Sequence, residues 1–271
     1  MNPMMKRHLI GICAALLLTL SLTPFCFGQT KAAARSTTAQ APAQRQLLSV
    51  QYVRIKSGMR AEWLEFRKNE TLPMLQKAGV KDQKVWNASA FGESANSYLI
   101  TTPIENLAQY DGPAWAVKAL GQEAADVYRT KNARFIESSH TIAIETRPDL
   151  SFQPSSQPKL MVLTESVIEN GYNTEYENFV KTKFLPLAKK AGPKGYRVSR
   201  VVYGGNLNLY RSAALFDSFE ELGKYREALA KEITAAKYSA KGAGIVSREN
   251  AVYRFVPELS IVPAPTTTAS K

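Results

Sequence analysis

Residues 58–79 read GMRAEWLEFRKNETLPMLQKAG, and residues 171–192 read GYNTEYENFVKTKFLPLAKKAG. The two segments start 113 residues apart and agree at nine of twenty-two positions, including both terminal glycines and one Leu-Pro pair. Self-similarity at a fixed spacing indicates a duplicated structural unit. The sequence therefore predicts two copies of one unit within 271 residues, each long enough to bury its own core.

The residues around each copy predict the same order of elements twice. In the first copy we expect strands at 47–56, 84–91, 97–101 and 140–146, with helices at 59–78 and 102–131. In the second copy we expect strands at 160–168, 197–203, 207–215 and 251–256, with helices over the repeated segment and from 217 onward. Each copy is thus β-α-β-β-α-β, the split βαβ arrangement of ferredoxin-like domains.

The second helix of each copy has a predicted capping box. Thr102-Pro103-Ile104-Glu105 supplies an N-cap, a proline at the first helical position and a glutamate that reaches back. The same spacing recurs from Asp217 to Glu220, and it places two residue pairs in register: Leu107 with Leu222, and Tyr110 with Tyr225. A later repeat, 148–152 against 257–261, has a shorter offset, so we expect about six extra residues near 111–113.

A ferredoxin-like sheet is covered by helices on one face only. Two copies in one chain can pack their open faces together and close a barrel with the helices outside. We therefore predict an α+β fold of two ferredoxin-like units forming an intramolecular pseudo-dimeric α/β barrel. The expected units are 46–152 and 153–262, with a flexible leader at 29–45 and a disordered tail at 263–271.

Residues 1–28 have the pattern of a signal peptide. Lys6 and Arg7 precede an apolar run at 9–22, and a small-residue end follows it. A signal anchor is the alternative, although the run is short for a membrane span. Lipid modification of Cys26 is rejected, because the small residue that such processing needs directly before the cysteine is missing. We expect an exported protein, periplasmic or extracellular, with no stable membrane span after signal removal.

Cysteine usage and charge restrict the chemistry. Cys13 and Cys26 are the only cysteines, so the mature chain would lack disulfides, thiolate metal sites and cysteine nucleophiles. The net charge of +12 falls to +10 without Lys6 and Arg7, which favours acidic partners. The basic run at 181–200 is either an anion-binding face or a solvated surface. We expect no nucleic-acid partner.

The predicted architecture resembles the dimeric α/β-barrel superfamily over residues 47–261. The resemblance rests on the element order, the tandem copies, and the Leu-Pro pairs Leu72-Pro73 and Leu185-Pro186. The superfamily includes antibiotic-biosynthesis-type monooxygenases, EthD-like and NIPSNAP-like proteins, chlorite dismutases and dye-decolourising peroxidases, and the NIPSNAP-like branch is the nearest. The resemblance implies a ligand or active site within the barrel or between sheet and helices, and a further homo-oligomer is left open. Its motifs are specific for architecture and not for chemistry.

His140 is the only histidine beyond the predicted signal segment. On the open sheet face it could act as a general base or metal ligand, while the alternative is a polar residue at a strand end. The counterpart of His140 in the second unit is Glu249, so any role of His140 would be asymmetric. The haem-binding members of the superfamily take a histidine from the sheet-helix region of the second unit, and this chain has no histidine there. We therefore expect no haem, no zinc and no other cofactor.

Glu70 and Lys183 occupy equivalent positions in the repeated helix. Helical periodicity places both on the line that faces the sheet, where Glu70 could be catalytic and Lys183 could bind a ligand. The competing interpretation is a bend at Pro73 and Pro186, which would rotate the apolar face away from these charges.

Five strand aromatics are the remaining candidates. They could line an apolar pocket that binds a small molecule, or they could simply be core residues. These residues are Tyr52, Trp86, Tyr98, Tyr203 and Tyr210.

No Ser-His-Asp order, phosphate loop, dinucleotide fingerprint or paired-carboxylate motif is visible. The first functional hypothesis is therefore a binding or accessory protein for a small apolar or anionic ligand. The second is a cofactor-free monooxygenase or isomerase-like enzyme, and the third is a structural or protein-binding role of the basic surface. An interior cavity that exposes His140 or Glu70 would favour the enzyme, and a filled interior would favour the interaction role.

Overall fold

The computed structural model describes residues 44–263. The predicted signal segment, nearly all of the predicted leader and nearly all of the predicted tail lie outside the described residues. The first half comprises β1 (Leu47–Ile55), α1 (Arg60–Phe66), η1 (Arg67–Thr71), α2 (Leu72–Lys77), β2 (Lys84–Ala88), β3 (Ser97–Ile104), η2 (Leu107–Tyr110), α3 (Trp115–Leu120), α4 (Gln122–Ala133), β4 (Ile136–Thr146) and η3 (Pro148–Leu150). The second half comprises β5 (Leu160–Ile168), α5 (Asn173–Phe179), η4 (Val180–Phe184), α6 (Leu185–Ala191), β6 (Gly195–Tyr203), β7 (Leu209–Phe216), α7 (Phe219–Ala235), β8 (Ile245–Phe255) and η5 (Pro257–Leu259).

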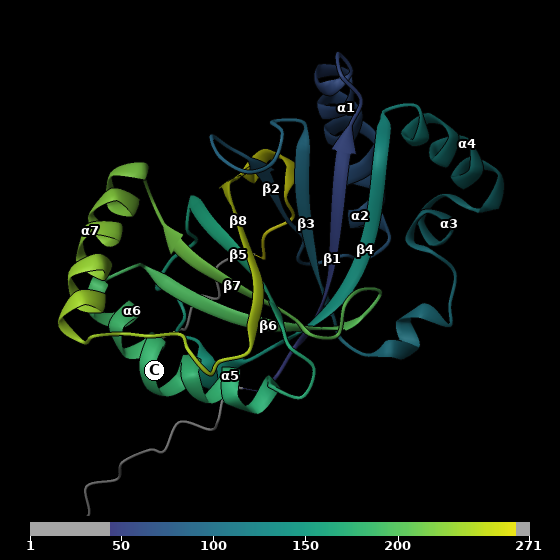
Figure 1. Ribbon diagram of the computed structural model, residues 1–271. Coiled ribbons are helices and arrows are strands. Elements are labelled where there is room, and N and C mark those ends of the chain that lie inside the picture. Colours follow the sequence, from purple (N-terminus) through teal and green to yellow (C-terminus); the bar gives the residue numbers. More distant parts are fainter. Residues whose placement is uncertain (1–43, 264–271) are drawn as a thin grey trace, which may run out of the picture. The chain divides into compact units, whose positions relative to one another are not determined.

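The eight strands form one closed antiparallel barrel in the order β1-β3-β2-β8-β5-β7-β6-β4. Two seams join the halves: β2 pairs with β8, and β4 pairs with β6. Helices α1 to α4 lie beside the first four strands and α5 to α7 beside the last four, outside the barrel (Figure 1). The predicted α+β class and the closure of two open sheet faces into a barrel are confirmed.

The strand register repeats at the spacing seen in the sequence. Tyr52 on β1 pairs with Leu99 on β3 and His140 on β4. Glu165, which lies 113 residues after Tyr52, pairs with Arg211 on β7 and Glu249 on β8. The two halves can therefore be compared position by position on the strands: Tyr52 with Glu165, Leu99 with Arg211, and His140 with Glu249.

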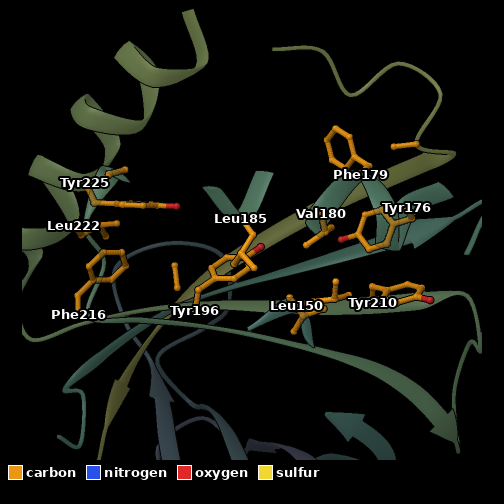
Figure 2. Close-up of a cluster of buried hydrophobic side chains, with 14 of the residues drawn as sticks. Leu150, Tyr176, Phe179, Val180, Leu185, Tyr196, Tyr210, Phe216, Leu222 and Tyr225 are labelled. Atoms are coloured by element: carbon orange, nitrogen blue, oxygen red, sulfur yellow. The ribbon is translucent and has the colours of Figure 1, made fainter. Parts of the chain in front are cut away.

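Alternate residues of each strand face the helices or the barrel interior. In the second half the helix-facing residues form a buried cluster beneath α5, η4, α6 and α7. Figure 2 shows Leu222 and Tyr225 of α7 at one end of this cluster and Tyr176 of α5 at the other, with Tyr196 of β6 between them. The inward residues form a separate cluster that draws on both halves, and this inner cluster surrounds the site described below.

The repeated Leu-Pro pair produces a widened helical turn in each half. The N–H groups of Leu72 and Leu185 bond to the carbonyls of Arg67 and Val180, five residues back, so η1 and η4 are π-helical. The proline that follows has no N–H to offer the carbonyl four residues before it, so a regular α-helical ladder cannot continue through the turn. The predicted change in the helix near each proline thus takes the form of one widened, π-helical turn.

Glu70 and Lys183 lie in these π-helical turns and are exposed. Glu70 forms an ion pair with Lys131 of α4, with a distance of 3.1 Å. The expectation that both charges face the sheet is therefore wrong, and the bend interpretation describes their positions.

The predicted helix start at Thr102 is also wrong. Thr102 and Pro103 belong to β3, and the buried Thr102 hydroxyl accepts a hydrogen bond from Gln83 Nε2 at 3.0 Å. The predicted register fails with it, because Leu107 and Tyr110 are exposed while Leu222 and Tyr225 are buried. The first half has η2, α3 and α4 in the place of the single helix α7.

The start of α7 lies one residue later than predicted. Ser218 is the N-cap, and its hydroxyl accepts from the Glu221 N–H at 3.1 Å. The Glu221 carboxylate accepts from the N–H of Asp217, the residue before the N-cap, and not from the Ser218 N–H that a capping box would use. Among the helices of residues 44–263, none is long and apolar enough to cross a membrane.

Candidate functional site

The barrel interior contains a cavity of about 320 Å³. This volume lies within the usual range of small-molecule sites, roughly 300–1,000 Å³. Its walls are mainly apolar, and both halves of the chain contribute to them. The apolar lining residues include Leu48, Trp86, Leu99, Ile144, Met161, Leu163, Ala213 and Leu215.

The strand register gives the cavity an inner end and a mouth. Leu99 and Arg211 line the inner end, at the level of their strand partners Tyr52 and Glu165. We call these four residues the floor. The mouth is polar and lies at the opposite ends of the same strands, where Gln46, Lys84 and Arg197 line the cavity.

Arg211 is the buried cation of the floor, with 4% of its side chain exposed. Its Nε donates to Glu165 Oε1 at 2.9 Å, and its guanidinium carbon lies 5.4 Å from the centre of the Tyr52 ring. Its Nη2 is buried without a hydrogen-bond partner in the part of the chain that the structure describes. An unsatisfied buried donor costs about 1–3 kcal/mol, so this arrangement is unfavourable unless something else occupies the donor.

Tyr52 and Glu165 hold Arg211 in place from beneath. The Tyr52 hydroxyl donates to Glu165 Oε1, the same oxygen that accepts from Arg211. Burial raises the pKa of Tyr52 well above its ordinary value; the nearby Glu165 raises it further, while Arg211 opposes the shift. The hydroxyl therefore stays protonated as a donor to Glu165 at neutral pH.

His140 stacks on Tyr52, with ring centres 4.6 Å apart and planes 4° from parallel. The structure thus brings together two of the residues singled out from the sequence. However, His140 is exposed and is not among the residues that line the cavity.

The mouth adds further charge to the cavity wall. Lys84 Nζ lies 3.1 Å from Asp82 Oδ2, and Arg197 Nε donates to Gln153 Oε1 at 2.9 Å. The lining contains three cationic side chains, Lys84, Arg197 and Arg211, against the single carboxylate of Asp82. The wall of the cavity is therefore positively charged.

The other predicted aromatics lie in different places. Trp86 is buried and lines the cavity. Tyr98 and Tyr210 face the helices; the hydroxyl of Tyr98 accepts from Arg60 Nε at 2.9 Å, and that of Tyr210 donates to Glu177 Oε1 at 2.7 Å. Tyr203 is 56% exposed.

A second cavity of about 510 Å³ lies between the sheet and the helices of the second half. Its lining includes Tyr176, Tyr196, Tyr225 and Tyr238, and burial raises the pKa of both Tyr225 and Tyr238 to about 12. The corresponding layer of the first half has a smaller cavity of about 350 Å³, which the buried Arg67 lines. Residues 153–271 contain no histidine, so the larger cavity has no histidine to ligate a haem iron.

Glu165 and Arg211 were not singled out from the sequence. Each is a lone charge within an apolar strand, LMVLTESVI for β5 and LYRSAALF for β7. That signal was available, because a charge at an inward position of a buried strand needs a partner. Within residues 44–263, no group of three histidine, cysteine or carboxylate side chains could hold a metal ion.

No family model matches this chain, and no curated protein matches it. Solved structures do match, at low identity. An anthrone oxidase-like protein aligns at 12% identity over 79% of this chain and 93% of its own, with a TM-score of 0.53. A proposed monooxygenase from Lactobacillus acidophilus NCFM aligns at 9% identity over 78% of this chain and 94% of its own, with a TM-score of 0.51.

A chlorite dismutase variant from Candidatus Nitrospira defluvii, in complex with cyanide, aligns at 7% identity over 79% of this chain and 92% of its own, with a TM-score of 0.50. At such identities the likeness concerns the fold alone. The NIPSNAP-like branch stays a prediction. The element order, the closed eight-stranded barrel and these matches together show that the chain has the fold of the dimeric α/β-barrel superfamily, with both ferredoxin-like units in one polypeptide.

Proposed function

We propose that the protein binds a small, largely apolar molecule inside the barrel. The observation that carries this proposal is the cavity of about 320 Å³, walled by apolar side chains from both halves and ending at the buried Arg211. Concave, mainly apolar sites with a few convergent polar groups are the usual form of small-molecule sites.

A binding role is better supported than catalysis. The names of two structural neighbours suggest oxidation of a small molecule, which is the alternative activity. That alternative needs a proton acceptor beside the substrate. Neither His140 nor Glu70 lines the cavity, and the one carboxylate that does, Asp82, is paired with Lys84 at 3.1 Å.

A cavity-filling variant tests the proposal. Ala213 lines the cavity, so Ala213→Phe should weaken the binding of decanol, a neutral apolar probe, at least tenfold by calorimetry. The matched control is Ala61→Phe, on the exposed side of α1, which should bind as the wild type does. Equal binding by a folded Ala213→Phe protein would refute the interior site. Incubating each ligand tried with the protein and analysing the products would reveal turnover and favour the enzyme.

The predicted signal segment would place this binding activity outside the cytoplasm. N-terminal sequencing of the protein recovered from its source would test export, because removal of residues 1–28 leaves Gln29 as the first residue.

A further inference from the structure

We propose that the ligand is a chain-like monocarboxylate whose carboxylate binds the guanidinium of Arg211 at the floor of the cavity. This inference rests on the proposed function and adds the chemical class and the orientation of the ligand. The apolar chain would extend from the floor toward the mouth, inside the barrel.

The first argument is the hydrogen-bonding state of Arg211. A guanidinium has five N–H donors, and within the described residues only its Nε makes a hydrogen bond, to Glu165. Nη2 has no partner although it is buried. A carboxylate that accepts from the Nη groups would remove the cost of this unsatisfied donor.

The second argument is that Arg211 is held in a fixed position. Its Nε edge is bound to Glu165, and the ring of Tyr52 lies 5.4 Å from its guanidinium carbon. Tyr52 in turn donates to Glu165, so the three side chains restrain one another. A donor that is already oriented loses little conformational entropy when it binds an anion.

The third argument is the charge of the lining. Glu165 balances Arg211, and Asp82 pairs with Lys84 at 3.1 Å. Arg197 makes its hydrogen bond to the neutral Gln153, so the lining and floor together retain one positive charge. A single carboxylate would neutralise this charge, whereas a cationic ligand would add to it.

The fourth argument is the shape of the walls. Arg211 and Leu215 both line the cavity and lie four residues apart on β7, which corresponds to about 13 Å at the rise of a β-strand. On β5 and β7 the lining side chains between these levels, Leu163 and Ala213, are apolar, while Arg197 of β6 lies beside Ala213. An extended hydrocarbon chain fits such a path, with its acidic end at Arg211.

The test compares decanoate with decanol, which share a chain and differ in the end group. By calorimetry at neutral pH, we expect the wild type to bind decanoate at least tenfold more tightly than decanol. The double variant Arg211→Met with Glu165→Gln removes both floor charges and leaves no unpaired ion. It should lose at least tenfold in decanoate affinity and retain its decanol affinity. Arg254→Met is the matched control, because Arg254 is an exposed strand arginine beside Phe219 and outside the cavity lining.

Two further outcomes separate the proposals. If neither probe binds the folded wild type, the interior binding function itself is wrong. If decanol binds and decanoate has no advantage, only the carboxylate inference is overturned. The inference is also overturned if the decanoate preference survives in the double variant but disappears in Lys84→Gln with Arg197→Gln, because the carboxylate would then bind at the mouth.

Discussion

Each half of the molecule buries an arginine at a position where the other half has an aliphatic residue. Arg67 of the first half, between sheet and helices, corresponds to Val180, which lies 113 residues later. Arg211 of the second half, inside the barrel, corresponds by strand register to Leu99. Both arginines are almost fully buried. Each buried charge therefore needs polar partners, which the aliphatic residue at the equivalent position does not need.

The difference lies in how the two arginines are bonded. Arg67 donates from Nη2 to Gln83 Oε1 at 2.6 Å and from Nε to the Leu259 carbonyl at 3.3 Å, so it connects the helix, the residue before β2 and the segment after β8. Arg211 has one hydrogen bond and a buried Nη2 without a partner in the described chain. A buried charge with its partners in place is structural. A buried charge with donors left over is a candidate for binding something else.

The largest effect on stability is expected from the satisfied arginine. Arg67→Ala removes the partners of Gln83 and Leu259 and leaves a cavity, so the free energy of unfolding should fall by about 3 kcal/mol. Urea unfolding measures this change. Binding of decanol should be unaffected in the folded variant, because Arg67 does not line the barrel cavity. A fall in the free energy of unfolding of less than about 1 kcal/mol would contradict the structural role assigned to Arg67.

A somewhat smaller effect on stability is expected in the floor. Glu165→Ala leaves the guanidinium of Arg211 buried without a counter-charge, which should cost about 2 kcal/mol because Glu165 is itself partly exposed. The double variant Arg211→Met with Glu165→Gln should recover most of that loss in urea unfolding. If the double variant is no more stable than Glu165→Ala, the isolated charge is not the cause.

The two glycines that end the repeated segment should behave alike. Gly79 and Gly192 have φ angles of +90° and +78°, in the region that other residues reach only with strain. A Cβ at Gly192 would meet nothing within 4 Å, and at Gly79 only Lys118 Nζ at 3.8 Å. Each substitution by alanine should therefore cost about 1 kcal/mol through the backbone alone, measured as the shift in urea midpoint. Unequal costs would show that the two helix ends have diverged.

The smallest effect is expected from a tyrosine that only the second half has. Tyr253 is buried where the first half has Ile144, and burial raises its pKa to about 12, with Glu93 and Glu165 contributing. Its pKa is higher folded than unfolded, so its contribution to stability is present below about pH 10 and is lost as the pH rises toward 12. Between pH 9 and pH 11 the wild type should lose about 1 kcal/mol more than Tyr253→Phe, measured by urea unfolding. Parallel pH curves would contradict this assignment.

The backbone plan could be predicted because it depends on repetition and local pattern. The predicted strand at 160–168 coincides with β5. The expectation that two open sheet faces pack together predicted the closed barrel that the structure has. The prediction of a helix start at Thr102 was wrong, because a threonine followed by proline and glutamate also fits the end of a strand. There the Thr102 hydroxyl bonds to Gln83 and not to a helix N-terminus.

The candidate site was less predictable, because it depends on contacts between the halves. Tyr52, Trp86 and His140 were proposed from residue type, and the structure places Trp86 in the cavity wall and Tyr52 in the floor. Glu165 and Arg211 are 46 residues apart, and Glu165 meets Tyr52 across 113 residues. Only the strand register of the closed barrel shows that these three side chains converge. The direction in which Glu70 and Lys183 face likewise depends on a π-helical turn. A period of 3.6 residues per turn does not describe such a turn.

The hydrogen bond from Tyr52 to Glu165 has an evolutionary consequence. The two residues occupy equivalent positions in the two copies, so they face each other across the pseudo-symmetry of the barrel. A dimer of two identical chains would have to place either two tyrosines or two glutamates at this point, and Arg211 would occur twice or not at all. Two copies with different sequences are free of that constraint. The unequal floor could therefore arise only after the two copies had diverged, and any function of Arg211 is no older than that divergence.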